Sequence, residues 1–155
     1  MITHHLLEPV AGRLAGDLYE RELELRYRVL RLPLGMARST VVFPFEDQSL
    51  HLVACAGSEV VGCVLFHPDG RCGGRLFQMA VDPLHQRTGL GRQLVVELES
   101  IVVARGVREV TLHARADAIG FYERLGYATF GEPYVEVGLP HRHMRRQLGP
   151  PRGDD

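Results

Sequence analysis

A short glycine-bearing turn from Gln86 to Gly91, which reads Q-x-x-G-x-G, constrains the fold of this chain more than any other stretch. It follows an extended apolar run, 76–81, and opens an amphipathic segment, 90–105. This order predicts a strand, a tight connection and a helix. The first amides of a helix lack intrahelical partners and the helix dipole favours negative charge, so the turn predicts a site for an anion such as phosphate. Gly89 and Gly91 have no Cβ, which would let a phosphate approach the backbone.

Two common phosphate-binding loops match this turn poorly. A P-loop needs a lysine at the phosphates, but the chain contains no lysine. A dinucleotide-binding loop reads G-x-G-x-x-G/A, and Leu94 occupies the position of its last small residue. For the hexapeptide taken alone, an ordinary strand–helix connection stays an open alternative.

Length and composition favour one globular domain. The chain has 155 residues, 45% of them hydrophobic, and a formal net charge of −1, which suits a single domain with a core. It has no long basic run, so no nucleic-acid partner is expected. No apolar run is long enough to span a membrane and the first ten residues lack a signal-peptide pattern, so we expect a cytoplasmic location without a membrane partner.

The cysteines are expected to be free thiols. Cys55, Cys63 and Cys72 lack the C-x-x-C spacing of zinc sites, and we place the first two in strands and the third in a loop.

The first half of the chain predicts a helix and a strand meander. A first strand ends near Leu6–Leu7, and apolar spacing predicts a helix over 14–30 that Pro33 and Gly35 end. A loop over 36–49 leads to strands at 50–56, 60–66 and 76–81. Gly57-Ser58 fits a type II′ hairpin turn between the first two of these strands.

In the second half of the chain, the spacing of apolar residues changes from the two-residue period of strands to the period of a helix. A helix over 90–105 precedes a strand at 109–113, which makes strands 76–81 and 109–113 parallel neighbours. A short helix over 116–125 stops at Gly126. Three further extended segments are expected, at 127–130, 134–137 and 144–148. The result is a mixed sheet with helices on both faces.

This order, with its turn, resembles the GNAT superfamily of acyl-CoA-dependent N-acyltransferases over about 50–144. The strongest segment is 79–91, and residues 118–127 are similar to the family's A-x-x-F-Y-x-x-x-G-[FY] helix. More weakly, residues 136–144 resemble the closing strand of the ElaA-like subgroup, and residues 29–35 resemble acceptor-side sequence of small bacterial members.

The resemblance implies an α/β (α+β) fold with a mixed, mostly antiparallel sheet of six to seven strands. Helices would lie on both faces, and a central parallel strand pair would splay apart. We expect a single N-acetyltransferase domain over 1–148 and a disordered tail over 149–155.

The resemblance also implies acetyl-CoA as co-substrate, with no metal. The pyrophosphate would lie on backbone amides of the turn, and the pantetheine arm would pair with the main chain of Met79 and Val81 between the splayed strands. The implied cofactor-binding residues are Met79, Val81, Gln86, Arg87, Thr88, Gly89, Leu90, Gly91 and Arg92. Many members carry an asparagine before the tyrosine helix that contacts the cofactor arm; here the segment reads Ala114-Arg115-Ala116-Asp117, which leaves that contact open.

Acyl transfer to an amine needs a proton donor for the departing thiolate and a route for the ammonium proton. The resemblance makes Tyr122 the candidate acid, although an aromatic side chain that only packs the short helix is the alternative. Glu136 and His141 are the candidate bases. The alternative is that Glu136 is a solvated strand residue and that His141 is a turn residue. His141-x-His143 lacks a third ligand, so no metal pair is expected.

The predicted function is therefore acetyl transfer from acetyl-CoA to a primary amine of a small molecule or peptide by direct attack in a ternary complex. A non-catalytic acyl-CoA-binding or sensing domain is the alternative. Glu136, Glu46 and Asp47 weakly favour a cationic acceptor. The oligomeric state is left as monomer or homodimer.

Overall fold

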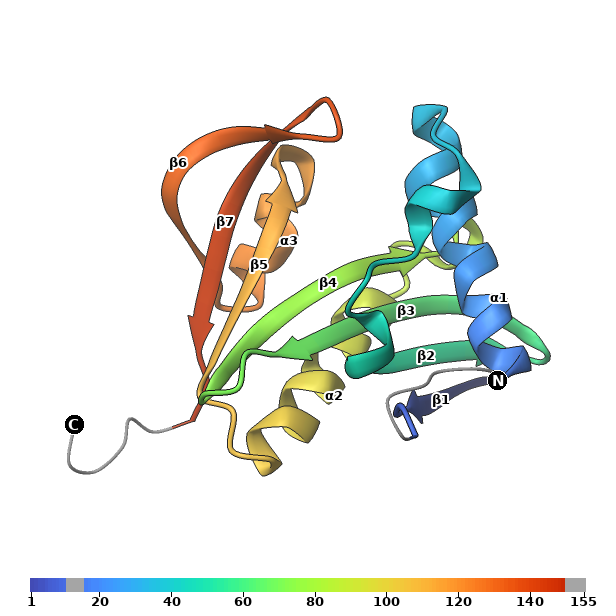
Figure 1. Cartoon of the computed structure of the whole chain (residues 1–155), viewed down its shortest axis with the longest axis horizontal. Coiled ribbons are helices and arrows are strands. Elements are labelled where there is room, and N and C mark those ends of the chain that lie inside the picture. Colours follow the sequence, from blue (N-terminus) through green and yellow to red (C-terminus); the bar gives the residue numbers. More distant parts are fainter. Residues whose placement is uncertain (11–15, 150–155) are drawn as a thin grey trace. The chain divides into compact units, whose positions relative to one another are not determined.

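A computed structural model describes residues 1–10 and 16–149 and contains a seven-stranded sheet (Figure 1). The strand order is β1-β2-β3-β4-β5-β7-β6. The β1–β2, β2–β3, β5–β7 and β6–β7 pairs are antiparallel, whereas β4 and β5 are parallel. The predicted mixed, mostly antiparallel sheet with a parallel pair is confirmed.

The strands are β1 (Ile2–Leu7), β2 (Leu50–Ala56), β3 (Glu59–Pro68), β4 (Gly73–Val81), β5 (Glu109–Arg115), β6 (Ala128–Glu136) and β7 (Leu139–Gln147). The α-helices are α1 (Asp17–Arg26), α2 (Leu90–Ala104) and α3 (Ile119–Arg124). In the part of the chain that the structure describes, no helix is long and apolar enough to cross a membrane.

The chain divides into two compact units. The first unit comprises Met1–His67 and Gln78–Leu98, and the second comprises Pro68–Phe77 and the residues from Glu99 onward. The boundary crosses β4 and α2, so each of these elements contributes to both units. The single domain predicted for 1–148 stays a prediction, and residues 150–155 of the predicted tail lie outside the described residues.

In the first unit, helices cover both faces of the sheet. A Cβ built on Gly62 of β3 would lie 2.9 Å from Cδ1 of Leu94, so glycine lets α2 approach this face closely. Side chains of successive strand residues point to opposite faces, so Cys63 and its cross-strand partner Val53 lie on the other face, together with His51. There Glu22 of α1 contacts His51.

Several local predictions are confirmed in the first unit. β2 has the predicted bounds, and Gly57 adopts a φ of 61°, as the first position of a type II′ turn requires. Cys55 and Cys63 are buried free thiols in strands, and Cys72 lies in the loop between β3 and β4, as expected.

The N-terminal helix is less regular than predicted. Residues 11–15 lie outside the described residues, α1 ends at Arg26, and a π-helical turn (Tyr27–Arg31) and a 3₁₀ turn (Leu32–Leu34) follow. Pro33 and the left-handed Gly35, with a φ of 68°, end the helical path as expected. The predicted loop 36–49 contains two further 3₁₀ turns, Arg38–Val41 and Glu46–Gln48.

In the second unit, β6 and β7 form a hairpin, and they contain most of the extended segments expected at 134–137 and 144–148. The segment 136–144, which resembles a family closing strand, includes the turn of this hairpin. Val137 and Gly138 have φ values of 47° and 76°, the two left-handed positions of a type I′ turn. Glu136 therefore ends β6, and His141 lies inside β7. Valine rarely occupies a left-handed position, so the position of this turn was not predicted from the sequence.

The sheet of the second unit has one apolar face and one polar face. Leu112 of β5 and its partner Met144 of β7 are buried on the apolar face. On the polar face, His113 of β5 pairs in register with His143 of β7. Arg75 of β4 shares that face because it pairs with Thr111, two residues before His113.

Candidate active site

The end of β4 in the first unit offers main-chain groups that β3 does not use. The Asp82 N–H donates to Val61 O of β3 at 2.8 Å. Because successive N–H groups of a strand point to opposite sides, the Met79 and Val81 N–H groups point away from β3. The register of β4 with β5 covers Gly73 to Arg75 only, although both strands continue beyond it.

A local irregularity precedes these two residues. Gln78, inside β4, adopts a φ of 52°, a left-handed conformation that is uncommon for a residue with a side chain. Such positions in strands accompany bulges, which re-aim the groups that follow. The irregularity lies directly before Met79.

The predicted turn is exposed and contains two left-handed residues. Arg87 has a φ of 64° and Gly89 a φ of 86°. A Cβ built on Gly89 meets no atom within 4 Å, so open space lies in front of this backbone. Gly89 O accepts from the Gln93 N–H at 3.0 Å, which leaves the amides of Leu90, Gly91 and Arg92 ahead of that bond. These features fit a ligand with phosphate groups.

Two side chains of the turn brace it. The Gln86 amide nitrogen donates to Val81 O at 2.9 Å, and the Thr88 hydroxyl donates to His85 O at 2.6 Å. Gln86 thus ties the turn to the end of β4 and occupies the Val81 carbonyl. Arg87 and Arg92 are exposed at the same turn and carry positive charge.

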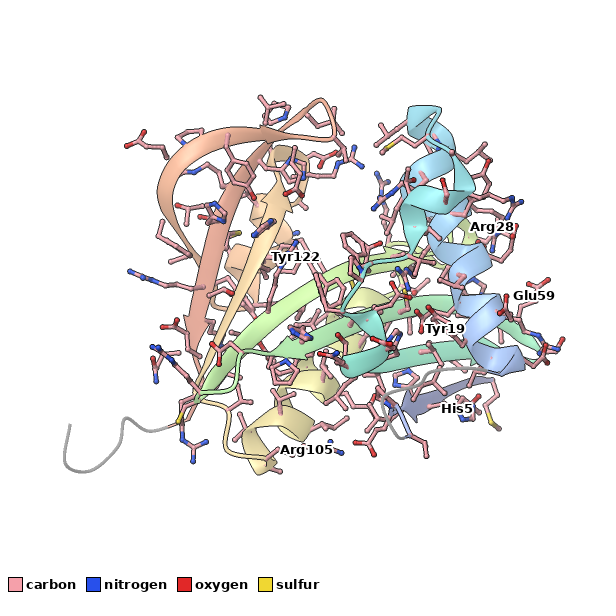
Figure 2. The ribbon with its side chains drawn as sticks, in the orientation of Figure 1. His5, Tyr19, Arg28, Glu59, Arg105 and Tyr122 are labelled. Atoms are coloured by element: carbon pink, nitrogen blue, oxygen red, sulfur yellow. The ribbon has the colours of Figure 1, made fainter. Side chains whose placement is uncertain are left out.

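Tyr122 lies on α3 in the second unit, with its side chain almost fully buried (Figure 2). Its ring packs against Phe121 and Tyr127, with centroids 5.0 and 5.8 Å away. No group of the described residues hydrogen-bonds to its hydroxyl, although the neighbouring Tyr127 hydroxyl donates to Glu99. Burial raises the pKa of Tyr122, so the phenol stays protonated across the physiological range.

The structure brings Glu136 and His141 together on the polar face of the second unit. Oε2 of Glu136 lies 3.6 Å from Nε2 of His141, and His141 Nδ1 donates to Leu139 O at 2.9 Å. His141 is 4% exposed and lies inside β7, so it is not a turn residue, whereas the Glu136 side chain is 39% exposed and the alternative of a solvated strand residue stays open for it. Tyr122 is not part of this cluster. Its neighbour Tyr127 shares Glu99 with Arg146, which pairs with Val110 on the opposite face of β5 and β7.

His113 joins this pair and was missed by sequence reasoning. Its Nδ1 lies 3.0 Å from Oε1 of Glu136 and 3.2 Å from Nη2 of Arg75. Burial lowers the pKa of His113, and Arg75 and His143 lower it further, against an opposing effect of Glu136. His113 is therefore neutral at pH 7 and can accept a proton. Its place on a polar strand face was visible in the sequence, but the partner that gives it a role was not.

Aromatic rings extend the polar face. Tyr134 of β6 stacks on His143 with centroids 4.4 Å apart, and its ring lies 5.8 Å from that of His113. The Tyr134 hydroxyl is buried and has no hydrogen-bond partner among the described residues. Burial raises the pKa of Tyr134, and Glu136 adds to the rise.

Arg115, at the position where the family's asparagine was expected, forms a long ion pair with Asp117 at 3.7 Å. Within the described residues, no group of three or more His, Cys, Asp or Glu side chains could hold a metal ion.

The acceptor-side role considered for Glu46 is wrong. Glu46 is 2% exposed in the first unit, where its carboxylate accepts from Arg26 at 2.8 and 3.0 Å and from Tyr19 of α1. Glu22 completes the buried cluster through Arg26 at 2.9 Å and His51 at 2.9 Å. This carboxylate stabilises the fold and cannot meet a substrate.

The sequence matches a known family over most of its length. Residues 37–148 match the sequence model described as the acetyltransferase (GNAT) domain. A Bacillus subtilis (strain 168) protein named "Putative acetyltransferase BSU40680" is 38% identical over 74 residues, which cover 48% of this chain and 50% of that protein. The chain thus matches only half the length of this relative.

The fold is shared with solved structures. Escherichia coli ElaA superposes with a TM-score of 0.81 at 21% identity, covering 94% of this chain and 99% of ElaA. An aminoglycoside 6'-N-acetyltransferase complexed with coenzyme A superposes with a TM-score of 0.71 at 19% identity, covering 95% and 98% of the two chains. At these identities the likeness shows the fold alone.

Proposed function

Because the chain belongs to the GNAT family of acetyltransferases, we propose that it transfers an acetyl group from acetyl-CoA to a primary amine of a small molecule or peptide. The exposed turn at the start of α2 carries the proposal, since Arg87 and Gly89 are left-handed and open space lies in front of Gly89, ahead of the first helical amides. The likeness to a fold solved with coenzyme A supports the same ligand.

Binding rests on backbone groups in this proposal. The amides from Arg87 to Arg92 bind the pyrophosphate, and the positive charges of Arg87 and Arg92 add attraction. Gln86 holds the turn against β4 through Val81 O. The outward Met79 and Val81 N–H groups pair with the amide groups of the pantetheine arm and polarise the thioester carbonyl.

Acetyl-CoA supplies the activated acyl group, and the chain supplies position and proton transfer. Tyr122 keeps its proton at neutral pH and donates it to the departing thiolate. Glu136 and His141, with His113, take the proton that the ammonium group loses before attack. The acceptor attacks directly in a ternary complex, without a covalent enzyme intermediate.

A thermal-shift titration tests the cofactor half of the proposal. Acetyl-CoA at a hundred times its dissociation constant should stabilise the folded state by about 2.7 kcal/mol. Coenzyme A without the acetyl group should act similarly, because the turn contacts the pyrophosphate. The absence of a shift at millimolar acetyl-CoA would contradict cofactor binding.

Thiol release separates an enzyme from a sensing domain. With a panel of amines, polyamines, amino acids and peptides, an acetyltransferase releases free coenzyme A only in the presence of a suitable acceptor. A thermal shift without release across the panel would favour the non-catalytic acyl-CoA-binding alternative.

A further inference from the structure

Arg75 is a half-buried guanidinium without a carboxylate partner in the described part of the chain. Its neighbours are His113 Nδ1 at 3.2 Å from Nη2 and the Phe77 ring, whose centroid lies 5.8 Å from the guanidinium carbon. By contrast, the buried Arg26 meets Glu22 and Glu46 within 3.0 Å. Arg75 is thus held without the partner that a buried cation in a protein normally has.

The energetic state of Arg75 points to a missing anion. Burial lowers the pKa of Arg75, and the attraction of Glu136 offsets only part of that effect. Its Nε atom is buried without a hydrogen-bond partner among the described residues. A buried donor left unpaired is unfavourable, and more so for a charged group, so a ligand that accepts from Arg75 recovers that free energy.

A second orphan donor lies on the same face. The Tyr134 hydroxyl is also buried without a partner in the described chain, and its ring packs 5.8 Å from the ring of His113. Tyr134 and Arg75 interact electrostatically, which places the phenol in the field of the guanidinium. Two unpaired donors, one of them charged, form a site that favours an anionic acceptor group.

The carboxylate of Glu136 contacts the same ring nitrogen of His113 as Arg75 does. Glu136 Oε1 and Arg75 Nη2 both contact His113 Nδ1, at 3.0 and 3.2 Å. The polar face therefore presents a negative and a positive group side by side. An α-amino acid carries the complementary pair, with an amine for Glu136 and a carboxylate for Arg75.

We infer that Arg75 and Tyr134 bind the carboxylate of the acceptor, and that the acceptor is an α-amino acid or a similarly compact amino carboxylate. The inference rests on the proposed function, because it names the substrate class of that reaction. It also modifies the cationic acceptor that Glu136, Glu46 and Asp47 suggested in the sequence, since Glu46 is already paired with Arg26 and Arg75 adds a positive group beside Glu136.

Matched acceptors test the inference. Each of several amino acids is compared with its carboxamide and with the decarboxylated amine, using thiol release and the mass of the acetylated product. The free acid should have a kcat/KM at least about tenfold above that of either analogue, because a hydrogen bond to a charged group contributes about 1.5–3 kcal/mol. Equal values for acid and amide would overturn the inference.

Arg75→Gln tests the assigned residue. This variant should lose at least about tenfold in kcat/KM for the free acids and little for the amides. Arg71→Gln, at an exposed arginine just before β4, is the matched control and should behave like the wild type. An acetyl-CoA thermal shift equal to that of the wild type verifies that Arg75→Gln is folded. A preference for free acids that survives in Arg75→Gln would contradict the role of Arg75.

A binding measurement separates this inference from the proposed function. Calorimetry with the amino acids and coenzyme A should detect binding to the wild type, weaker binding to Arg75→Gln, and weaker binding of the amides. If the amino acids bind in this pattern but no amine is acetylated, the proposed reaction fails and the carboxylate site stands. If amines are acetylated but the amino acids neither bind in this pattern nor react preferentially, the carboxylate site fails and the reaction stands.

Discussion

Nδ1 of His113 on β5 lies 3.0 Å from Oε1 of Glu136 at the end of β6, although β7 separates the two strands. The hairpin turn at Val137 and Gly138 positions Glu136 for this contact. His141 approaches the other carboxylate oxygen at 3.6 Å, so Glu136 bridges two histidines. Such a group of three can take up and pass on one proton.

The pH dependence of the reaction tests His113 as the proton acceptor. The unprotonated ring is the active form, and its pKa is lowered from 6.5 by burial, Arg75 and His143. Activity should therefore be constant near neutral pH and fall only below pH 6.5. Glu136 raises the pKa of His113, so the residual activity of Glu136→Gln should fall at a lower pH than that of the wild type. A kcat/KM profile that starts to fall above pH 7, or a Glu136→Gln profile displaced upward, would exclude this assignment.

Tyr122→Phe tests the proton donor. A general acid contributes about 10²–10⁴-fold, so kcat should fall within this range while acetyl-CoA affinity stays nearly unchanged. Tyr127→Phe is the matched control, because Tyr127 is a buried neighbour whose hydroxyl bonds to Glu99. The control should lose stability and keep its kcat. Equal turnover of Tyr122→Phe and the wild type would remove Tyr122 from the mechanism.

Gly89→Val tests the turn. Gly89 has a φ of 86°, so valine costs about 1–2 kcal/mol of backbone strain and places methyl groups in the open space before the amides. Gly106→Val is the matched control, because Gly106 follows α2 with a φ of 94° and also faces open space. Both variants should lose stability, but only Gly89→Val should bind acetyl-CoA at least about tenfold more weakly by calorimetry. Similar acetyl-CoA affinities for the two variants would show that the phosphate site does not lie at this turn.

Arg26→Met tests the buried cluster of the first unit. Removing Arg26 leaves Glu22 and Glu46 buried without their cation, which should lower the free energy of unfolding by about 3–5 kcal/mol. Arg38→Met is the control, because Arg38 forms an exposed pair with Glu24 at 2.5 Å and should leave the urea midpoint nearly unchanged. Equal urea midpoints for the two variants would show that the cluster does not stabilise this unit.

The pKa of Glu46 in the same cluster predicts how the stability of the fold changes at acid pH. Burial raises the pKa of Glu46, but Arg26 and Tyr19 outweigh it, so the pKa lies below the ordinary value of 4.5. The stabilisation by Glu46 is therefore present above pH 4.5 and is lost as the pH falls through the lowered value. Arg26→Met should remove this part of the acid sensitivity.

The sequence predicted what local patterns determine. β2, the hairpin at Gly57 and the start of α2 follow from alternation, turn chemistry and helical period, and the structure has them at the predicted positions. The turn at Gly89 was predictable for the same reason, because a left-handed residue before a helix favours glycine.

The sequence did not predict the side-chain clusters, because they depend on tertiary contacts. Glu22 and Arg26 stand four residues apart on one helix, but Glu46 and His51 reach them only after the chain folds back. His113 and Arg75 meet because β4 and β5 pair in parallel, and Glu136 reaches them only through a turn with an unexpected valine. Periodicity identifies a polar face, but it does not identify the partners on it.

Acetyl transfer itself is the most direct test of the central claim. The protein is incubated with isotopically labelled acetyl-CoA and the amine panel, and product masses and free thiol are measured together. The account predicts one labelled acetyl group on an acceptor amine for each coenzyme A released, with Tyr122→Phe strongly slowed. Saturable acetyl-CoA binding with no acetylated amine across the panel would contradict it.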